Sequence, residues 1–320
     1  MVVILLTAFT RLRLCCDIKA ILALCAGWSG VVEQVMMEAL QDSIFKNVVA
    51  RQSRVNLDVV VHGSIDSTNS WCLAQQKAGR RLPFACFAEE QTSGKGRRGK
   101  NWVVKSHSNI AMSVAWPFDL SNQPVHLLSL SVAITIAQTL EHFGLQHVQI
   151  KWPNDVYVQD KKIAGVLIET QPIRDGGATG NNEKDASIAV VIGVGLNYDM
   201  SALVTEEVLS LTDICEQFAL QENSLLPVRQ DVASSLLVNI VSICQDLQEF
   251  VASNFELFSS RYDYCKGKNV EIVLDNEVSL SGVAQGINER AELLVLVDGE
   301  LQIFNSAEVS VRAKGEEVSQ

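Results

Sequence analysis

The sequence predicts an α+β protein in which a mixed β-sheet packed with helices is followed by a small domain of short strands. Three observations favour this fold class. Segments with alternating apolar and polar residues recur between residues 55 and 196, around one long apolar helix pattern at 126–143. A second helical pattern follows at 227–262, and only short alternating segments remain from residue 267 onward.

The individual elements follow from apolar runs that end at glycine, proline, asparagine or aspartate. The expected strands of the main sheet are 55–62, 84–89, 110–116, two runs within 148–158, 163–169 and 188–196. The expected helices are 31–49, 71–78, 126–143 and the region 227–262. We expect residues 172–185 to form a mobile hairpin loop and residues 203–220 to form irregular helix and loop. In the tail, Asp298-Gly299 is a strong hairpin signal.

The 320-residue length allows a poorly determined N-terminal extension (1–54), a main domain (55–265) and a small SH3-like β-barrel domain (266–320). A formal net charge of −11 disfavours a general nucleic-acid coat. The eight cysteines include no CxxC pair, which is typical of free thiols in a reducing cytoplasm. No stretch reaches the roughly 18 uninterrupted apolar residues of a membrane span, and the start lacks the charge order of a secretory signal.

A basic, glycine-rich segment, Gly94–Trp102, is the clearest candidate for a ligand site. It contains four cationic side chains and three glycines within nine residues of an acidic chain. Glycine lets the backbone approach a ligand closely, and arginine pairs well with carboxylate and phosphate oxygens. The segment therefore suits a small anion, although a solvated surface loop would have the same composition.

Three further motifs flank expected strands. Asp66–Asn69 contains helix-capping residues, which serve either as a plain N-cap or as donors to a polar ligand. The turn at Lys151–Asp155 is either a simple hairpin or the place of a carboxylate that needs a cation. Gly165 interrupts one strand, where it would let a ligand press against the backbone, and Gly193 and Gly195 interrupt another. We find no Ser/His/Asp or Cys/His set and no zinc spacing.

Together these motifs resemble the biotin–protein ligase family. The resemblance is carried by Asp66-Ser-Thr-Asn69, Gln91 through Trp102, Lys151-Trp-Pro-Asn-Asp155, Lys162-Ile-Ala-Gly165 and Gly193-Val-Gly-Leu-Asn197, and it covers roughly residues 55–315. It implies a catalytic domain of the class II synthetase and biotin ligase type. It also implies ATP-dependent formation of biotinyl-5′-AMP with release of pyrophosphate. The biotin would then pass to a specific lysine of a biotin carboxyl carrier protein, such as that of acetyl-CoA carboxylase.

The resemblance also implies roles for single residues, with catalysis assigned to Lys162 and Arg97. The implied biotin-binding residues are Ser67, Thr68, Asn69, Gln91, Gly94, Lys95, Gly96, Arg97, Lys162, Gly165, Gly193 and Gly195. The implied ATP-binding residues are Arg97, Arg98, Trp102, Lys151, Asn154, Asp155, Lys162 and Asn197, and Asp155 is the implied Mg²⁺ ligand. Lys95 departs from the family pattern, in which arginine is more usual, so that charge is kept without the bidentate fork.

Two other functions remain open at this stage. A lipoate–protein ligase would share the fold and the adenylate chemistry, although the basic loop together with Lys151–Asp155 favours biotin. A biotin-responsive transcriptional regulator would need a basic recognition helix within residues 1–54, where the cationic residues are too dispersed, so we do not expect DNA binding. An edge strand of the sheet would support a homodimer. The sequence leaves open the identity of the carrier, the oligomeric state and the role of residues 1–54.

Overall fold

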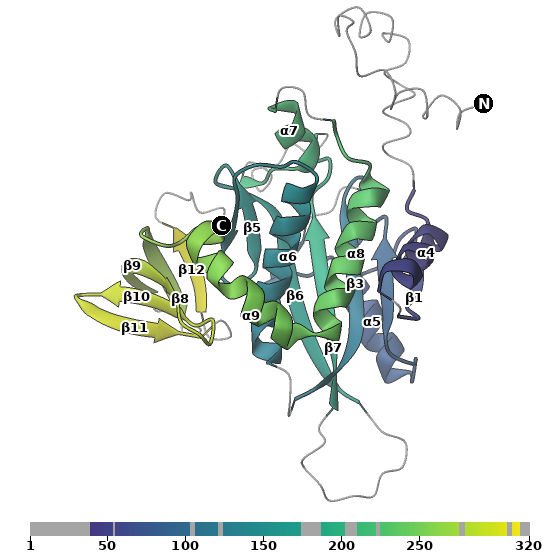
Figure 1. The fold of residues 1–320 in the computed structure, drawn as a ribbon, viewed down its shortest axis with the longest axis horizontal. Coiled ribbons are helices and arrows are strands. Elements are labelled where there is room, and N and C mark those ends of the chain that lie inside the picture. Colours follow the sequence, from purple (N-terminus) through teal and green to yellow (C-terminus); the bar gives the residue numbers. More distant parts are fainter. Residues whose placement is uncertain are drawn as a thin grey trace, which may run out of the picture. The chain divides into compact units, whose positions relative to one another are not determined.

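The structure, a computed structural model, describes residues 39–53, 55–102, 106–120, 124–173, 187–201, 210–221, 225–274, 279–305 and 309–313. It contains two β-sheets, with helices packed on the larger one (Figure 1). The larger sheet comprises β1 (Asp58–His62), β2 (Phe84–Ala88), β3 (Ile110–Asp119), β4 (Val148–Lys151), β5 (Asp155–Val158), β6 (Lys161–Pro172) and β7 (Ser187–Leu196). The smaller sheet comprises β8 (Asn269–Leu274), β9 (Ser279–Ile287), β10 (Leu293–Val297), β11 (Glu300–Phe304) and β12 (Val309–Ala313).

The described helices are distributed before, between and after the strands of the larger sheet. They are α4 (Asp42–Gln52), α5 (Thr68–Lys77), α6 (Leu128–His142), α7 (Ile214–Ala219), α8 (Arg229–Gln245) and α9 (Leu247–Leu257). Three short helical turns add to them: η2 (Arg97–Gly99), η3 (Val125–Leu127) and η5 (Phe258–Tyr262). The predicted α+β class is therefore confirmed.

The larger sheet is mixed, in the order β1-β2-β3-β7-β6-β5-β4. Strands β1 and β2 are parallel, and every other neighbouring pair is antiparallel. Strands β6 and β7 pair over nearly their whole length, so that Gly165 lies opposite Gly195 and Leu167 lies opposite Gly193. This register brings glycines that are far apart in the sequence into one patch at the centre of the sheet.

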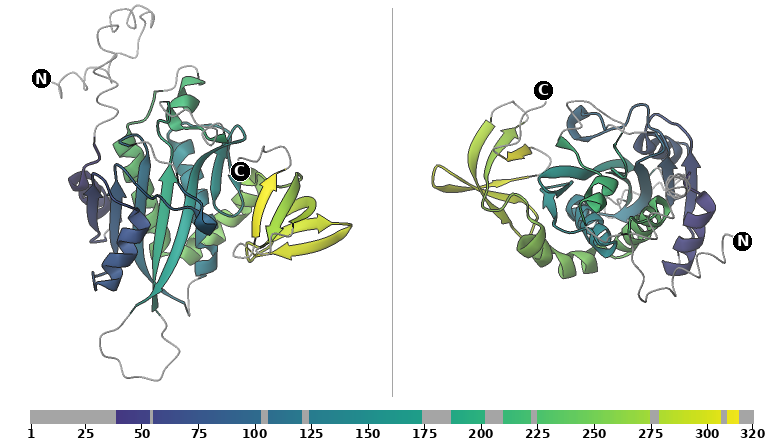
Figure 2. Two further views of the ribbon diagram at one scale, coloured as in Figure 1. Left: turned by 180° about the vertical axis from the view of Figure 1, so that it is seen from behind. Right: turned by 90° about the horizontal axis from the view of Figure 1, so that it is seen from above.

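Helices cover the two faces of this sheet unequally. Helices α6 and α8 pack side by side on one face (Figure 1). Helix α5 lies on the opposite face, as the view from behind in Figure 2 shows. There Cys72 of α5 packs in a buried cluster with Phe84, Cys86 and Ala115 of β2 and β3. The first turn of α5 therefore lies against the central strand β3 on this face, where Thr68 and Asn69 contact Ser113.

Helix α4 begins later than the sequence indicated. The predicted helix spans 31–49, whereas α4 covers Asp42–Gln52 and residues 31–38 lie outside the described part. Phe45 is fully buried and stacks on Phe87 of β2, with ring centroids 4.0 Å apart and planes 8° from parallel. Residues 39–53 thus pack with the sheet, although we predicted them to be part of an N-terminal extension.

The predicted helical region 227–262 is divided into two helices. Asp246 separates them with φ −146° and ψ 76°, and its side chain accepts a hydrogen bond from the Glu249 N–H at 3.0 Å. An aspartate in this conformation caps the first turn of the next helix, because its oxygen replaces a missing backbone acceptor. Apolar periodicity continues across the break, so periodicity alone did not reveal it.

The C-terminal residues form an antiparallel sheet in the order β11-β10-β9-β8-β12, consistent with an SH3-like domain. The predicted hairpin at Asp298-Gly299 joins β10 to β11, and both residues have positive φ, 51° and 86°. Positive φ at both central positions is the geometry that selects glycine and aspartate in two-residue hairpins. This part of the sequence prediction is confirmed.

Several other sequence predictions are confirmed or fall outside the described residues. The strands around Lys151–Asp155 form an antiparallel pair, and β6 and β7 form the predicted hairpin, whose loop at 174–186 is outside the described part. Residues 1–38, with Cys15, Cys16 and Cys25, are outside it as well. The helices of the described segments include none that is both long and apolar enough for a membrane span.

A buried ion pair fixes the two ends of the segment that carries the basic loop. Arg229 at the start of α8 is fully buried, and its Nη1 lies 2.8 Å from Oε2 of Glu89, directly after β2. The same Nη1 donates to the Asn109 carbonyl at 3.1 Å, directly before β3, and the N–H of His107 donates to the Glu89 carbonyl at 2.9 Å. The Leu40 N–H also donates to Oε1 of Glu89 at 2.5 Å. One guanidinium thus joins α8 to both ends of the segment between β2 and β3.

Arg229→Met should lower the free energy of unfolding by about 3–5 kcal/mol, because it leaves the Glu89 carboxylate buried without its cation. Urea unfolding measures this. The double variant Glu89→Gln/Arg229→Met should recover part of the loss, because no unpaired charge remains. Lys161→Met, which removes an exposed ion pair to Glu216, serves as the control and should cost less than about 1 kcal/mol. An Arg229→Met variant as stable as this control would contradict the role of the pair.

Candidate functional site

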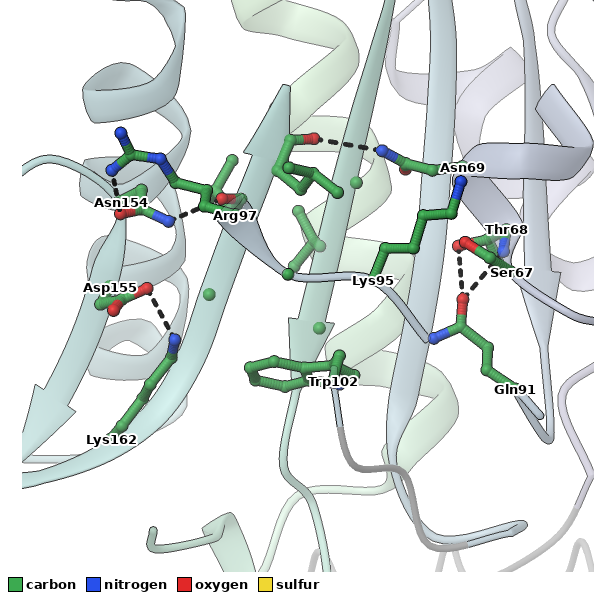
Figure 3. A pocket seen from close by; sticks show the side chains of 17 residues that line it. Ser67, Thr68, Asn69, Gln91, Lys95, Arg97, Trp102, Asn154, Asp155 and Lys162 are labelled. Carbon is green, nitrogen blue, oxygen red and sulfur yellow. Dashed lines mark hydrogen bonds and ion pairs between the residues drawn. The ribbon is translucent and has the colours of Figure 1, made fainter. Parts of the chain in front are cut away.

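A pocket opens on the face of the sheet that carries α5, and Figure 3 shows its side chains. Its walls come from the first turn of α5, the basic loop, the β4–β5 turn, the first half of β6 and residues 193–195 near the end of β7. The lining residues are Ser67, Thr68, Asn69, Gln91, Lys95, Gly96, Arg97, Trp102, Asn154, Asp155, Lys162, Gly165, Val166, Leu167, Gly193, Val194 and Gly195. Most of the predicted site residues therefore meet in one place.

One end of the pocket is lined mainly by neutral polar groups, and Figure 3 shows the Lys95 side chain extending from the basic loop toward this end. Ser67 caps α5, since its Oγ accepts a hydrogen bond from the Ser70 N–H at 3.5 Å. The Thr68 N–H donates to Oε1 of Gln91 at 2.8 Å, and the Thr68 hydroxyl lies 3.0 Å from the same oxygen. The hydroxyl of Ser113 lies 2.7 Å from that of Thr68 and 2.6 Å from Oδ1 of Asn69. Donors and acceptors are thus held in fixed positions by one another.

The basic loop folds back on itself over the pocket. The Trp102 N–H donates to the Gly94 carbonyl at 2.9 Å, and the Gly96 N–H donates to the Lys100 carbonyl at 2.7 Å. From this loop Arg97 reaches Asn154, and its Nη1 donates to Oδ1 at 3.2 Å (Figure 3). Asn154 is itself held, because its amide donates to the Val166 carbonyl at 2.8 Å. The loop thereby places a guanidinium at the end of the pocket away from Gln91.

Burial lowers the pKa of the Arg97 guanidinium, since leaving water disfavours the charged form. The nearby charge of Arg98 acts in the same direction, whereas Asp155 raises the pKa. A guanidinium starts from so high a value that it stays protonated at neutral pH. Arg97 therefore brings a partly desolvated positive charge into the pocket.

Lys162 adds a second cation at this charged end. Its Nζ lies 2.7 Å from Oδ1 of Asp155 across the β5–β6 pair, and both side chains are about a quarter exposed. The same ammonium lies 5.2 Å from the centre of the Trp102 ring. Asp155 is the single carboxylate among the described lining residues, against the cations Lys95, Arg97 and Lys162. This imbalance of charge favours an anionic ligand.

Three glycines of β6 and β7 form the floor between the two ends. A Cβ on Gly195 would overlap the indole of Trp102, including Nε1 at 2.5 Å, and one on Gly193 would overlap Oδ1 of Asn69. A Cβ on Gly165 would lie 3.0 Å from Nζ of Lys162 and 3.2 Å from the Trp102 ring. Each of these glycines makes room for a residue that lines the pocket, as their positions within strands indicated.

Four of the predicted site residues do not line the pocket. Gly94 packs beneath the loop, where a Cβ would lie 2.5 Å from the Trp102 carbonyl oxygen. Arg98 points away, and its Nη1 donates to the Val273 carbonyl of β8 at 3.3 Å. Lys151 is buried with Nζ 3.4 Å from the Tyr157 hydroxyl, and the amide of Asn197 donates to the Thr212 carbonyl at 3.1 Å. Their assignment to a ligand stays a prediction.

Two residues of the site were missed in the sequence. Ser113 lies within the apolar strand β3 and contacts both Thr68 and Asn69. Glu169 on β6 accepts a hydrogen bond from Nδ2 of Asn69 at 2.8 Å. The only signals in the sequence were a serine within the apolar run of β3 and a glutamate directly after the apolar run of β6. Neither indicates a contact with Asn69 until the order and register of the strands are known.

Comparison with known families agrees with this geometry. Residues 61–181 match the model of the biotin/lipoate A/B protein ligase family, and residues 267–312 match that of the biotin protein ligase C-terminal domain. The bifunctional ligase/repressor BirA of Escherichia coli is 31% identical over 261 residues, which cover 80% of this chain and 74% of that protein. The chain belongs to the biotin–protein ligase family. It is accordingly a ligase, and the sequence-based assignment to this family is confirmed.

Other members of the family match over a similar range. The biotin–[acetyl-CoA-carboxylase] ligase of Mycobacterium tuberculosis is 26% identical over 263 residues, which cover 79% of this chain and 88% of that protein. The solved structure of the biotin protein ligase from Aquifex aeolicus, in complex with biotin and ATP, has a TM-score of 0.62 at 22% identity. The match covers 80% of this chain and 99% of the Aquifex aeolicus chain, and it confirms the fold.

Gly195→Ala should displace the Trp102 indole into solvent, because β7 is paired on both sides and cannot move away from the added methyl group. Acrylamide quenching of Trp102 fluorescence should therefore increase. The Trp102 signal is obtained by subtracting the fluorescence of a matched protein that also carries Trp102→Phe. Gly63→Ala is the control, because a Cβ there would meet no atom within 4 Å. Equal quenching in the Gly195→Ala and Gly63→Ala proteins would contradict the proposed contact.

Proposed function

We propose that this ligase activates biotin with ATP and transfers the biotinyl group to a lysine of a biotin carboxyl carrier protein. One observation carries the proposal: the pocket joins a neutral hydrogen-bonding end to a cationic end across a glycine floor. Biotin has the matching polarity, because a ring with N–H and C=O groups is joined by an apolar chain to a carboxylate. The ring would lie near Thr68 and Gln91, and the carboxylate near Arg97 and Lys162.

The first half-reaction requires two anions to approach each other. The biotin carboxylate would attack the α-phosphorus of ATP, and the bond to the oxygen bridging the α- and β-phosphates would break to release pyrophosphate. Arg97 and Lys162 offset the repulsion between the two anions and stabilise the charge that builds up on the α-phosphate. Because both side chains are already held by Asn154 and Asp155, little reorganisation is needed.

Asp155 fits a role on the magnesium side of this site. Mg²⁺ commonly keeps several waters and binds through one or two carboxylates together with substrate phosphates. A single carboxylate that faces the pocket beside Lys162 meets this requirement, and Asp155 would hold the ion. When bound, Mg²⁺ would supply positive charge to the phosphates of ATP.

The second half-reaction needs no protein nucleophile. The ε-amine of the carrier lysine would attack the acyl carbon of biotinyl-5′-AMP, lose a proton and expel AMP. The basic loop would shield the mixed anhydride from water while Arg97 holds the adenylate.

The family model that matches residues 61–181 also includes lipoate ligases. The neutral end of the pocket favours biotin, because the dithiolane ring of lipoate offers neither N–H nor C=O groups. A pocket that keeps its polar groups in place for a hydrogen-bonding ring rejects an analogue without them, since those groups would be left unpaired.

ATP–pyrophosphate exchange by the purified protein tests this proposal. We expect exchange to depend on added biotin, because only an activated carboxylate returns pyrophosphate to ATP. A parallel reaction with lipoate is the control and should give no exchange above background. Exchange with lipoate alone would replace the proposed substrate, and no exchange with either acid from folded protein would overturn the proposed reaction.

Lys162→Ala should reduce exchange by at least about 10²–10³-fold, the usual loss when one preorganised group is removed from a transition state. The matched control is Lys161→Ala on the neighbouring lysine, which pairs with Glu216 at 3.4 Å outside the pocket. Both proteins should unfold near the wild-type temperature. Normal exchange by folded Lys162→Ala would remove this residue from the mechanism.

A further inference from the structure

Glu169 on β6 holds the side chain of Asn69 without itself lining the pocket. Its Oε2 accepts a hydrogen bond from Nδ2 of Asn69 at 2.8 Å, and the Leu167 carbonyl lies 3.4 Å from the same nitrogen. Asn69 is 3% exposed and lines the neutral end of the pocket. A half-buried carboxylate thus acts on the pocket through the amide of another residue.

This contact determines which way the amide of Asn69 faces. A carboxylate and a backbone carbonyl only accept hydrogen bonds, so the NH₂ group of Asn69 must face β6. Its Oδ1 must then face the opposite side, where the Ser113 hydroxyl lies at 2.6 Å (Figure 3 shows Asn69 at this end of the pocket). The reverse orientation would place Oδ1 against the Glu169 carboxylate.

The fixed amide sets the hydrogen-bond direction of Ser113. This residue has one hydroxyl proton, and Oδ1 of Asn69 takes it at 2.6 Å. The single proton of the Thr68 hydroxyl then serves either Ser113 at 2.7 Å or Oε1 of Gln91 at 3.0 Å. Oε1 of Gln91 accepts the Thr68 N–H, which turns Nε2 of Gln91 toward the basic loop. A Cβ on Gly94 of that loop would lie 3.2 Å from this nitrogen. The neutral end therefore offers an acceptor at Asn69 and a donor at Gln91 in a defined order.

We propose that Glu169 is a specificity-determining positioning residue that fixes this order of donor and acceptor through the amide of Asn69. The ligand it selects carries N–H and C=O groups on one ring, as the cyclic urea of biotin does. The assignment rests on the proposed function and extends it to a residue that does not contact the ligand. Glutamine at this position would hold the Asn69 amide in either orientation, because it both donates and accepts.

Exchanging the two side chains tests the assignment. In Asn69→Asp, two carboxylates face each other and the acceptor of the pocket is disturbed. In Asn69→Asp/Glu169→Gln, the glutamine NH₂ donates to the new aspartate, whose other oxygen still accepts from Ser113. This double variant has the net charge of the wild type and restores the original direction at Ser113.

We expect Asn69→Asp to raise the KM for biotin on the order of tenfold or more, as for one buried hydrogen bond lost. Glu169→Gln alone should raise it roughly two- to tenfold. The double variant should return most of the way to the wild-type value. In all three proteins the KM for ATP should stay unchanged, because the charged end of the pocket is untouched. Gln171→Glu, which adds one negative charge two residues along the same face of β6, is the charge control and should leave the KM for biotin unchanged.

Additive effects of the two single substitutions would overturn the assignment. A parallel rise in the KM for ATP would do the same, since a general loss of structure moves both substrates. Unfolding temperatures show whether each variant is folded. If Asn69→Asp does not fold, Glu169→Gln alone still tests the role of Glu169, because it should raise the KM for biotin and not the KM for ATP. The two kinds of failure can be distinguished by the wild-type protein. If the wild type shows biotin-dependent exchange, these results would overturn only the role of Glu169. A wild type without exchange would overturn the proposed function itself.

Discussion

Strands β6 and β7 have glycine at three positions where the pocket lies. The other features of the site depend on the space that these glycines leave above the sheet. Gly165 and Gly195 face each other in register, and Gly193 lies opposite Leu167. Because these positions have no Cβ, Trp102 and Asn69 can lie directly on the backbone of the sheet. A ligand on this floor would meet peptide groups below, a neutral end on one side and a cationic end on the other.

The cationic end is stabilised by local pairing and not by the overall charge of the protein, which is −11. Arg97 is anchored by Asn154 and Lys162 by Asp155, so each cation is placed by a partner from the β4–β5 turn. The loop that brings Arg97 is in turn held at its ends by the buried pair of Glu89 and Arg229. The position of one guanidinium in the pocket thus depends on another guanidinium in the core.

Much of this arrangement could be predicted from the sequence, because its signals are local. The turn at Lys151–Asp155, the hairpin at Asp298-Gly299 and the glycines inside strands each depend on residues within a few positions. The break at Asp246 was missed because the apolar period of the helices continues through it. Ser113 and Glu169 were missed for another reason. Their contacts join β3, α5 and β6, and only the order and register of the strands bring them together.

The glycine floor has a consequence for how such a protein changes over generations. A methyl group at position 193 or 195 would take the space of Asn69 or Trp102, while the backbone pairing of β6 and β7 would not involve the added group. A gene copy that acquired such a change would still encode the same strands in the same order. The identity of these few residues, and not the pattern of helices and strands, would then distinguish an active copy from an inactive one.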